Sequence, residues 1–373
     1  MWHTDTPSQA ELRTLATLRE PGVVSIFLPT TPVSTDDRDQ LTLRNLIDEA
    51  VTRLRESEML DKAAVLEVEE GLEDLLDDGM FWTYQGHGLA IFATPSRRTV
   101  YRLPLEVEQQ VQVSDRAFLK PLVSVLSHLS SCYVLALSEN SVRLVEVTSD
   151  LTPTTTTVPG LPEDAASAVG RESIKDRSHR GRLVGSEGKR VHLRAYARQV
   201  DAALRPVLSS SDVPLVLAAV EPVRSIFRSV SSFPQLADAV IETSPDRLTD
   251  QQLAEEARGL LDSLYRTRMQ QVADLFEARR SEGRAVTDIA DAARAATAGA
   301  VETLVVDRSA SFLGSVADDG TVAFDEDTDD GTAYGVVDEV LRRVLLTGGD
   351  VLSVEAALVP GGQPVAAILR WAP

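Results

Sequence analysis

The chain has 373 residues, of which 43% are hydrophobic and 5% aromatic, so it can bury more than one core without relying on aromatic packing. Its formal net charge of −20 disfavours non-specific nucleic-acid binding by the whole surface, so any contact with a polyanion must be local. The single cysteine, Cys132, excludes an internal disulfide, and its apolar neighbours indicate a buried thiol. No apolar stretch approaches the roughly 18 residues of a membrane span, and no signal peptide is evident. We therefore expect a cytoplasmic protein without membrane contacts.

The first third of the chain has the pattern of an α/β domain, which we place at 1–128. Apolar residues at helical spacing over 8–20 end at a Pro-Gly pair, and the β-branched run that follows indicates a buried strand. Polar loops and further periodic segments then alternate. The predicted elements are a strand over 23–28, helices over 41–54 and 59–76, and strands over 89–93, 99–104 and 108–113.

The middle third, 129–245, is predicted to be a second α/β domain. Two strands within 132–147 flank a turn at Glu139–Asn140, and an apolar run over 214–220 is typical of a buried parallel strand. Between them, a helix is predicted over 191–208.

The last third, 246–373, alternates helices with strands, which favours an α/β sandwich and gives three domains in all. A long amphipathic helix begins near Thr249, and the chain ends in two strands joined at Pro360–Gly362. The predicted elements are helices over 250–283, 286–301 and 334–348, and strands over 302–307, 351–359 and 364–371.

The stretch 171–205 reverses the sign of the charge in this acidic chain. Its glycine-containing part indicates a loop, 171–190, that leads into a helix with Arg190, Arg194 and Arg198 along one face. Such a loop suits a phosphate backbone, whereas the plainer interpretation is a solvated loop that offsets the acidic surroundings. The candidate RNA-binding residues are Arg177, Arg180, Arg182, Lys189, Arg190, Arg194 and Arg198, and the candidate loop residues are Gly181, Gly185, Glu187 and Gly188.

Two segments resemble ligand motifs but depart from them. GRLVGSEGKR has Leu183 where a P-loop needs its first glycine, and Arg190 where it needs serine or threonine. The acidic run from Asp325 to Asp329 has Val336 where an EF-hand needs its bidentate glutamate. We therefore predict no metal site and no cofactor.

Several phrases resemble the bacterial branch of the archaeo-eukaryotic release factor/Pelota superfamily, the baeRF families. They are LLDDGMFWTYQGHGLAIFATP, YRLP, CYVLALSENSVRLVEV and PGLPED, followed near the C-terminus by AARAATAGAVETLVVD. The resemblance implies an N-terminal α/β domain, a middle domain of RNase H-like fold, and a C-terminal α/β domain like the kink-turn-binding ribosomal proteins.

The resemblance also implies a function. The loop that carries Gly-Gly-Gln in release factors corresponds to 181–190, where this chain has Gly185-Ser186-Glu187-Gly188, so no catalytic residue is predicted. The implied protein is a non-hydrolytic, ribosome-associated translation factor of rescue, stalling or hibernation that binds ribosomal RNA or tRNA. The Gly-Gly-Gln at 361–363 lies between two apolar strands and indicates a hairpin turn.

Two other classes of function remain open at the level of sequence. A hydrolase, either an esterase or a nuclease on an RNase H-like middle domain, would take its acid and base from Glu187, His179 and His192. A protein-binding scaffold would rely on the acidic surface. The sequence alone leaves the oligomeric state and the partners open, because one fold hosts many functions.

Overall fold

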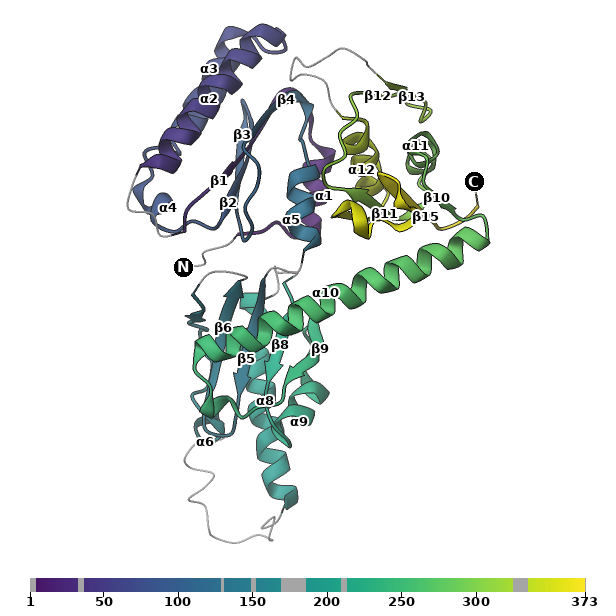
Figure 1. The fold of residues 1–373 in the computed structure, drawn as a ribbon. Coiled ribbons are helices and arrows are strands. Elements are labelled where there is room, and N and C mark those ends of the chain that lie inside the picture. The colour runs from purple at the N-terminus through teal and green to yellow at the C-terminus, as the bar shows by residue number, and fades with distance from the viewer. Residues whose placement is uncertain are drawn as a thin grey trace. The chain divides into compact units, whose positions relative to one another are not determined.

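The computed structural model describes residues 5–32, 37–128, 131–148, 152–168, 186–208, 213–324 and 335–372. The chain folds into two compact units: unit 1 combines Met1–His128 with Arg266–Pro373, and unit 2 is Leu129–Tyr265 (Figure 1). Both are mixtures of helices and sheets, which confirms the predicted α/β class. The division into three domains stays a prediction.

The N-terminal part of unit 1 is an antiparallel sheet with strand order β3-β2-β1-β4. Its strands are β1 (Arg19–Pro29), β2 (Gly88–Thr94), β3 (Arg97–Leu103) and β4 (Gln110–Arg116). Its helices are α1 (Gln9–Thr17), α2 (Arg38–Ser57), α3 (Lys62–Glu73), α4 (Gly79–Thr83) and α5 (Lys120–Ser127).

The central strand β1 is buried on both faces because successive side chains point in opposite directions. Val24 and Ile26 pack with α2 and α3, which lie side by side along one face in Figure 1. Val23 and Phe27 point to the other face, where α1 and α5 contribute to the core. The β-branched run over 23–28 therefore forms a buried strand, as predicted.

The C-terminal part of unit 1 is a sheet with strand order β10-β15-β11-β14, in which β14 is parallel and β15 antiparallel to β11. The strands are β10 (Ala285–Val286), β11 (Val301–Asp307), β14 (Asp350–Val354) and β15 (Val365–Leu369), and a separate pair is β12 (Gly314–Val316) and β13 (Val322–Phe324). The helices are α10 (Asp250–Ser281), α11 (Ile289–Thr297) and α12 (Val336–Leu346), with short 3-10 turns at Ala356–Leu358 and Pro360–Gly362.

The glycines at 361 and 362 form a turn but not the predicted hairpin. Both have positive φ, 79° and 66°, in the left-handed region that favours glycine. The strands before and after them, β14 and β15, are not paired, because β11 lies between them in the sheet. The hairpin was a wrong prediction from local signals, since pairing order depends on distant segments. The acidic run 325–329 lies outside the described residues.

Unit 1 has one core that both of its parts share. Leu12, Phe27 and Leu119 belong to the same buried cluster as Val340 and Leu341 of α12. A hydrogen bond also joins the two parts, because the Ser353 backbone amide of β14 donates to the Ser127 side-chain hydroxyl at the end of α5, at 2.8 Å. The first and last thirds of the chain therefore fold as one body.

Unit 2 is a five-stranded sheet with strand order β7-β6-β5-β8-β9. The pairs β5–β6 and β6–β7 are antiparallel, whereas β5–β8 and β8–β9 are parallel, which is the RNase H-like arrangement that the resemblance implied. The strands are β5 (Ser131–Leu137), β6 (Val142–Thr148), β7 (Thr154–Thr156), β8 (Leu215–Ala218) and β9 (Leu236–Ile241). The helices are α6 (Ala165–Ala168), α8 (Ser186–Leu208) and α9 (Val223–Val230), with a 3-10 turn at Pro245–Arg247.

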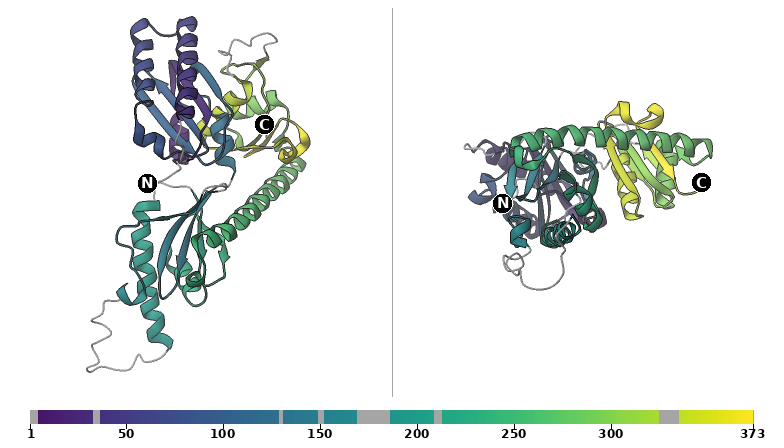
Figure 2. Two further views of the ribbon diagram at one scale, coloured as in Figure 1. Left: turned by 60° about the vertical axis from the view of Figure 1, so that its left-hand side comes forward. Right: turned by 90° about the horizontal axis from the view of Figure 1, so that it is seen from below.

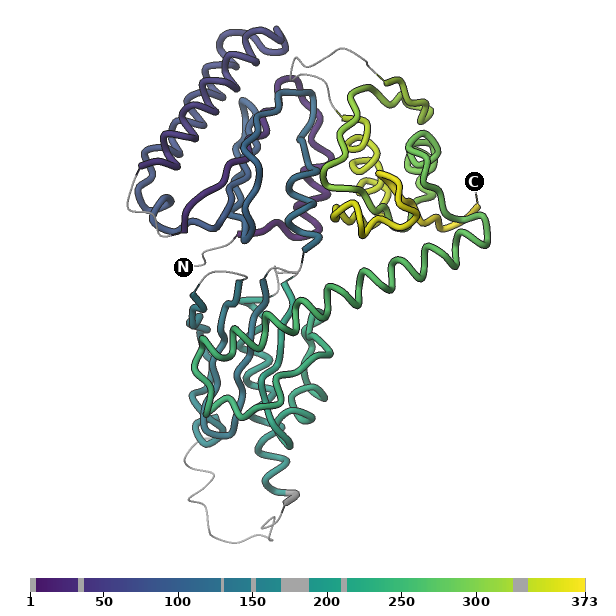
Figure 3. The backbone as a smooth tube through the Cα atoms, viewed as in Figure 1, coloured from purple at the N-terminus to yellow at the C-terminus, as the bar shows by residue number. Residues whose placement is uncertain are grey.

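Helices cover both faces of this sheet (Figure 2). Leu135 and Leu217 pack with α8 and α9 on one face, whereas Val134 and Val216 pack with the first half of α10 on the other. Cys132 packs on the second face and is buried, as predicted. This burial raises the pKa of its thiol to about 12. The helix α10 has 32 residues, and Figure 3 traces it without a break.

Candidate nucleic-acid interface

The helix α8 carries the described part of the predicted basic site. It begins at Ser186, earlier than the predicted start at 191, and therefore already includes Glu187 and Gly188, which the sequence had indicated as loop residues. An acidic residue in the first turn favours this start, because it complements the positive end of the helix dipole. The side chains of Leu193 and Val200 are buried against the sheet, as the periodicity predicted.

Three arginines spaced four residues apart form a row on the exposed surface of α8, which we call the arginine row: Arg190, Arg194 and Arg198. All three are exposed, and none makes a hydrogen bond or an ion pair with another residue in the described ranges. Neighbours in the row are about 6 Å apart along the axis, given the rise of 1.5 Å per residue. Like charges at this spacing repel each other slightly, so a bound anion would stabilise the row.

Lys189 differs from these arginines because it already has an anionic partner. Its ammonium lies 2.8 Å from a carboxylate oxygen of Glu139, and the two side chains are 61% and 36% exposed. Glu139 belongs to the turn between β5 and β6, so this contact joins the first turns of α8 to the end of these two strands. Sequence reasoning missed the pair, because the two residues are far apart along the chain.

The turn that holds Glu139 is itself fixed by hydrogen bonds to Asp246. Its carboxylate accepts from the Ser138 hydroxyl at 2.7 Å, from the Asn140 amide at 2.8 Å and from the Ser141 hydroxyl at 2.8 Å. Partial burial opposes ionisation, but these hydrogen bonds outweigh it and lower the pKa of Asp246. The anionic partner of Lys189 therefore stands on a well-connected turn.

The other end of α8 is fixed by Asp201, which is 4% exposed. Its carboxylate accepts a hydrogen bond of 2.8 Å from Arg205, one turn further along, and one of 2.9 Å from the Ser232 amide in the segment after α9. Arg205 is therefore a structural cation and not part of the arginine row.

The structure thus brings together four of the seven candidate RNA-binding residues on one helix. Arg177, Arg180 and Arg182, like Gly181 and Gly185, lie outside the described residues, as does the side chain of Glu187. His179 of the hydrolase alternative lies outside them too, whereas His192 is exposed on α8. Within the described ranges, His, Cys, Asp and Glu side chains form no group of three placed to hold a metal ion.

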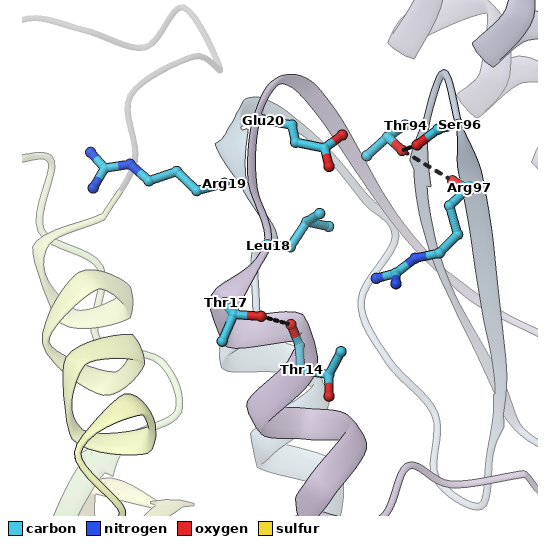
Figure 4. Close-up of a pocket in the computed structure, with 8 residues that line it drawn as sticks. All are labelled: Thr14, Thr17, Leu18, Arg19, Glu20, Thr94, Ser96 and Arg97. Carbon is cyan, nitrogen blue, oxygen red and sulfur yellow. Dashed lines mark hydrogen bonds between the residues drawn. The ribbon is translucent and has the colours of Figure 1, made fainter.

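Unit 1 contains a separate small pocket of about 300 Å³ that no sequence motif indicated (Figure 4). It lies between the end of α1 and the turn between β2 and β3, and hydroxyl groups dominate its lining. The Thr17 hydroxyl donates to the Thr14 carbonyl at 2.6 Å, and Arg19 points away from the pocket and pairs with Asp115 at 3.2 Å. These side chains are used in local contacts, so we assign the pocket no role.

Residues 129–267 match the family described as Bacterial archaeo-eukaryotic release factor family 11. Unit 2 is therefore similar to this family. The resemblance predicted from the phrases of the sequence is thereby confirmed. The matched segment contains α8 with the arginine row and the Lys189–Glu139 pair. No curated protein matches the chain.

Three solved structures match the chain at low sequence identity. An archaeal translation termination factor, aRF1, is 14% identical, with 98% of this chain and 99% of that chain covered and a TM-score of 0.25. The structure of ribosome-bound archaeal Pelota and ABCE1 gives 14% identity, coverage of 99% and 95%, and a TM-score of 0.38. The S. cerevisiae translation termination-like factor Dom34 gives 11% identity, coverage of 99% and 94%, and a TM-score of 0.40. In the described parts of the chain, no helix has the length and apolar composition needed to cross a bilayer.

Proposed function

We propose that the protein is a cytoplasmic, ribosome-associated translation factor of the release factor/Pelota type that binds ribosomal RNA or tRNA and does not hydrolyse peptidyl-tRNA. Rescue, stalling and hibernation of ribosomes are the processes that such a factor serves. The RNA contacts are assigned to the arginine row together with the basic segment that precedes α8. One observation carries the proposal: the release factor-like unit has a row of exposed arginines without partners among the described residues, in a chain of net charge −20.

Physical chemistry supports phosphate as the ligand of this row. Guanidinium groups hold phosphate oxygens through paired hydrogen bonds, and contacts of this kind position a protein on a nucleic acid without reading its sequence. The acidic remainder of the surface repels RNA, so the row would also set the orientation of the complex. A factor that recognises a ribosomal state rather than a base sequence needs contacts of this type.

Replacing Arg190, Arg194 and Arg198 together with glutamine is expected to weaken binding to purified ribosomes at least tenfold. For every arginine that binds a phosphate, its removal should also lower the dependence of log affinity on log salt by about one unit. Co-sedimentation through sucrose cushions at several salt concentrations measures both quantities. The matched control replaces Arg13, Arg44 and Arg268, which are exposed in other elements, and removes the same charge. Equal binding by the two triple variants would contradict the proposed interface.

Replacing Glu139 with glutamine is expected to strengthen binding to ribosomes about threefold at low salt, a size typical of one exposed charge pair. The change removes a carboxylate next to the arginine row and frees the ammonium of Lys189, which lies 2.8 Å from it. The control is Glu256→Gln, an exposed position on α10, which packs on the opposite face of the sheet. Weaker ribosome binding by Glu139→Gln would contradict this expectation. It would mean that Glu139 holds Lys189 in the orientation that binding needs.

The same purified proteins distinguish the hydrolase and scaffold alternatives from the proposed function. Turnover of peptidyl-tRNA or RNA by the purified protein, with loss in His192→Ala, would favour the hydrolase. Stable association with extract proteins after complete removal of RNA, unaffected by the arginine variants, would favour the scaffold.

A further inference from the structure

A cavity in unit 1 lies between its two parts and has a volume of about 700 Å³. It is formed by the segment before β4 and the start of β4, by α5, by the loop that follows β11 and by the first turn of α12. Because one core joins these parts, the cavity belongs to a single folded body. Its volume is within the range of binding sites for small molecules and short peptides.

The floor of the cavity is apolar and buried. Val107, Phe118, Val125 and Val337 line it, and each of them is at most 8% exposed. Gln112 of β4 also lines it, and its buried amide nitrogen has no hydrogen-bond partner among the described residues. Burying an unsatisfied donor is unfavourable, so a carbonyl oxygen of a ligand that reached this nitrogen would stabilise it.

The charges around the cavity favour a cation. Glu106 and Glu108 are exposed at its rim, whereas the guanidinium of Arg308 is already paired with Glu355 at 2.9 Å. The ammonium of Lys120 is partly buried and donates to the Ala310 carbonyl at the same site. The two rim carboxylates would repel an anionic ligand. A purely polar ligand would leave the apolar floor of the cavity in contact with water.

We propose that this cavity binds a short peptide segment of a partner protein in which an apolar side chain stands beside a lysine or arginine. The apolar side chain would cover Phe118 and Val125, the basic one would pair with Glu106 and Glu108, and a peptide carbonyl would accept from Gln112. A polyamine would satisfy the rim but not the floor. The inference goes beyond the proposed binding of RNA and does not depend on it, since that function is assigned to unit 2.

Fluorescence anisotropy of the full-length protein with labelled six-residue peptides tests the proposal. The probe alternates leucine and lysine, and two comparison peptides carry glutamate for lysine or serine for leucine. We expect binding of the first probe and at least tenfold weaker binding of both others. Spermidine in excess should not displace the probe. Equal binding of the serine peptide, or displacement by spermidine, would overturn the proposal, because the site would then recognise charge alone.

A charge-matched pair of variants locates the site. Glu106→Gln with Glu108→Gln should weaken binding of the leucine–lysine probe about fivefold at low salt, as expected for two exposed charge pairs. The control, Glu67→Gln with Glu70→Gln, removes the same charge from exposed positions on α3 and should leave it unchanged. Equal weakening in both variants would mean that the probe binds the acidic surface at large, which would overturn the site.

A third variant fills the cavity. Ser124 lines it from α5 and is only partly buried, so Ser124→Phe places a large side chain in the empty volume. We expect loss of probe binding with a circular dichroism spectrum like that of the unchanged protein. Retained binding of the probe by a folded Ser124→Phe variant would overturn the proposal. If Ser124→Phe does not fold, the rim variants decide the question, because they alter exposed side chains only. Ribosome binding by these variants should stay unchanged, so failure here and failure of the proposed function are distinguishable.

Discussion

Replacing Glu339 with alanine is expected to lower the free energy of unfolding of unit 1 by about 3–5 kcal/mol, as for other buried charge networks that lose one member. Glu339 is 3% exposed and accepts hydrogen bonds from Arg116, from Arg342 at 2.9 and 3.2 Å, and from Arg343 at 2.7 Å. The substitution removes the carboxylate that these three guanidinium groups share. Arg116 is the last residue of β4 and the other arginines lie on α12, so the network joins the two parts of unit 1.

The same network predicts a loss of stability in acid. Burial by itself would raise the pKa of Glu339, but the hydrogen bonds from Arg342 and Arg343, with the charge of Arg116, outweigh it and lower the pKa below the ordinary 4.5. A carboxyl group whose pKa is lowered on folding stabilises the protein above its ordinary pKa and loses that effect as the pH falls through the lowered value. The free energy of unfolding of the unchanged protein should therefore fall more steeply below pH 4.5 than that of Glu339→Gln.

Hydrogen exchange followed by mass spectrometry is the measurement for these variants, because the unfolding of a protein with two units does not reduce to a two-state analysis of one melting curve. Peptides from β4 and α12 should exchange faster in Glu339→Ala, whereas peptides from unit 2 should not change. Glu70→Ala, at an exposed position on α3, is the control. A loss of less than about 1 kcal/mol would mean that the arginines find other partners.

Replacing Tyr196 with alanine is expected to destabilise unit 2 by about 3–5 kcal/mol through the cavity that it leaves. Tyr196 is fully buried in the core between α8 and the sheet, and burial raises the pKa of its phenol. It lies on the side of α8 opposite the arginine row, so its loss should also weaken the proposed binding of RNA by loosening the helix that presents the row. Hydrogen exchange in unit 2 and co-sedimentation with ribosomes measure the two effects.

Tyr196→Phe separates packing from hydrogen bonding in this test. The hydroxyl makes one long hydrogen bond of 3.5 Å, to the Ser141 carbonyl, so its removal should cost no more than about 1 kcal/mol. A loss in Tyr196→Phe as large as in Tyr196→Ala would show that the hydroxyl, rather than the ring, fixes α8.

Local pattern was sufficient to predict the elements that carry the candidate site. The apolar positions Leu193, Val200 and Leu204 recur at helical spacing, and all three are buried in α8. The same pattern leaves Arg190 and Arg194 on the outer face, where they are exposed. Periodicity predicts such faces because burial of one helical stripe is a local consequence of sequence.

Contacts between distant segments could not be predicted in this way. Three features depend on which distant segments meet in the fold. They are the ion pair between Lys189 and Glu139, the position of β11 between β14 and β15, and the ion pair between Arg116 and Glu339. Residues such as Arg116 and Glu339 look like ordinary surface charges in the sequence, since charged residues are rarely buried unless they are paired. The sequence shows which residues are charged but not which of them pair with each other.

Because unit 1 is built from two separate parts of the sequence, it can complete its fold only late in synthesis. Residues 1–128 and 266–373 form one body, and Leu12, Phe27 and Leu119 share their core with Val340 and Leu341. During synthesis from the N-terminus, the first part leaves the ribosome long before the helix that covers this face exists. Unit 2 is made in the interval and is continuous in sequence, so it can complete its fold first. The nascent chain thus exposes an apolar surface for the time needed to translate more than a hundred further residues, a period in which chaperone protection would matter most.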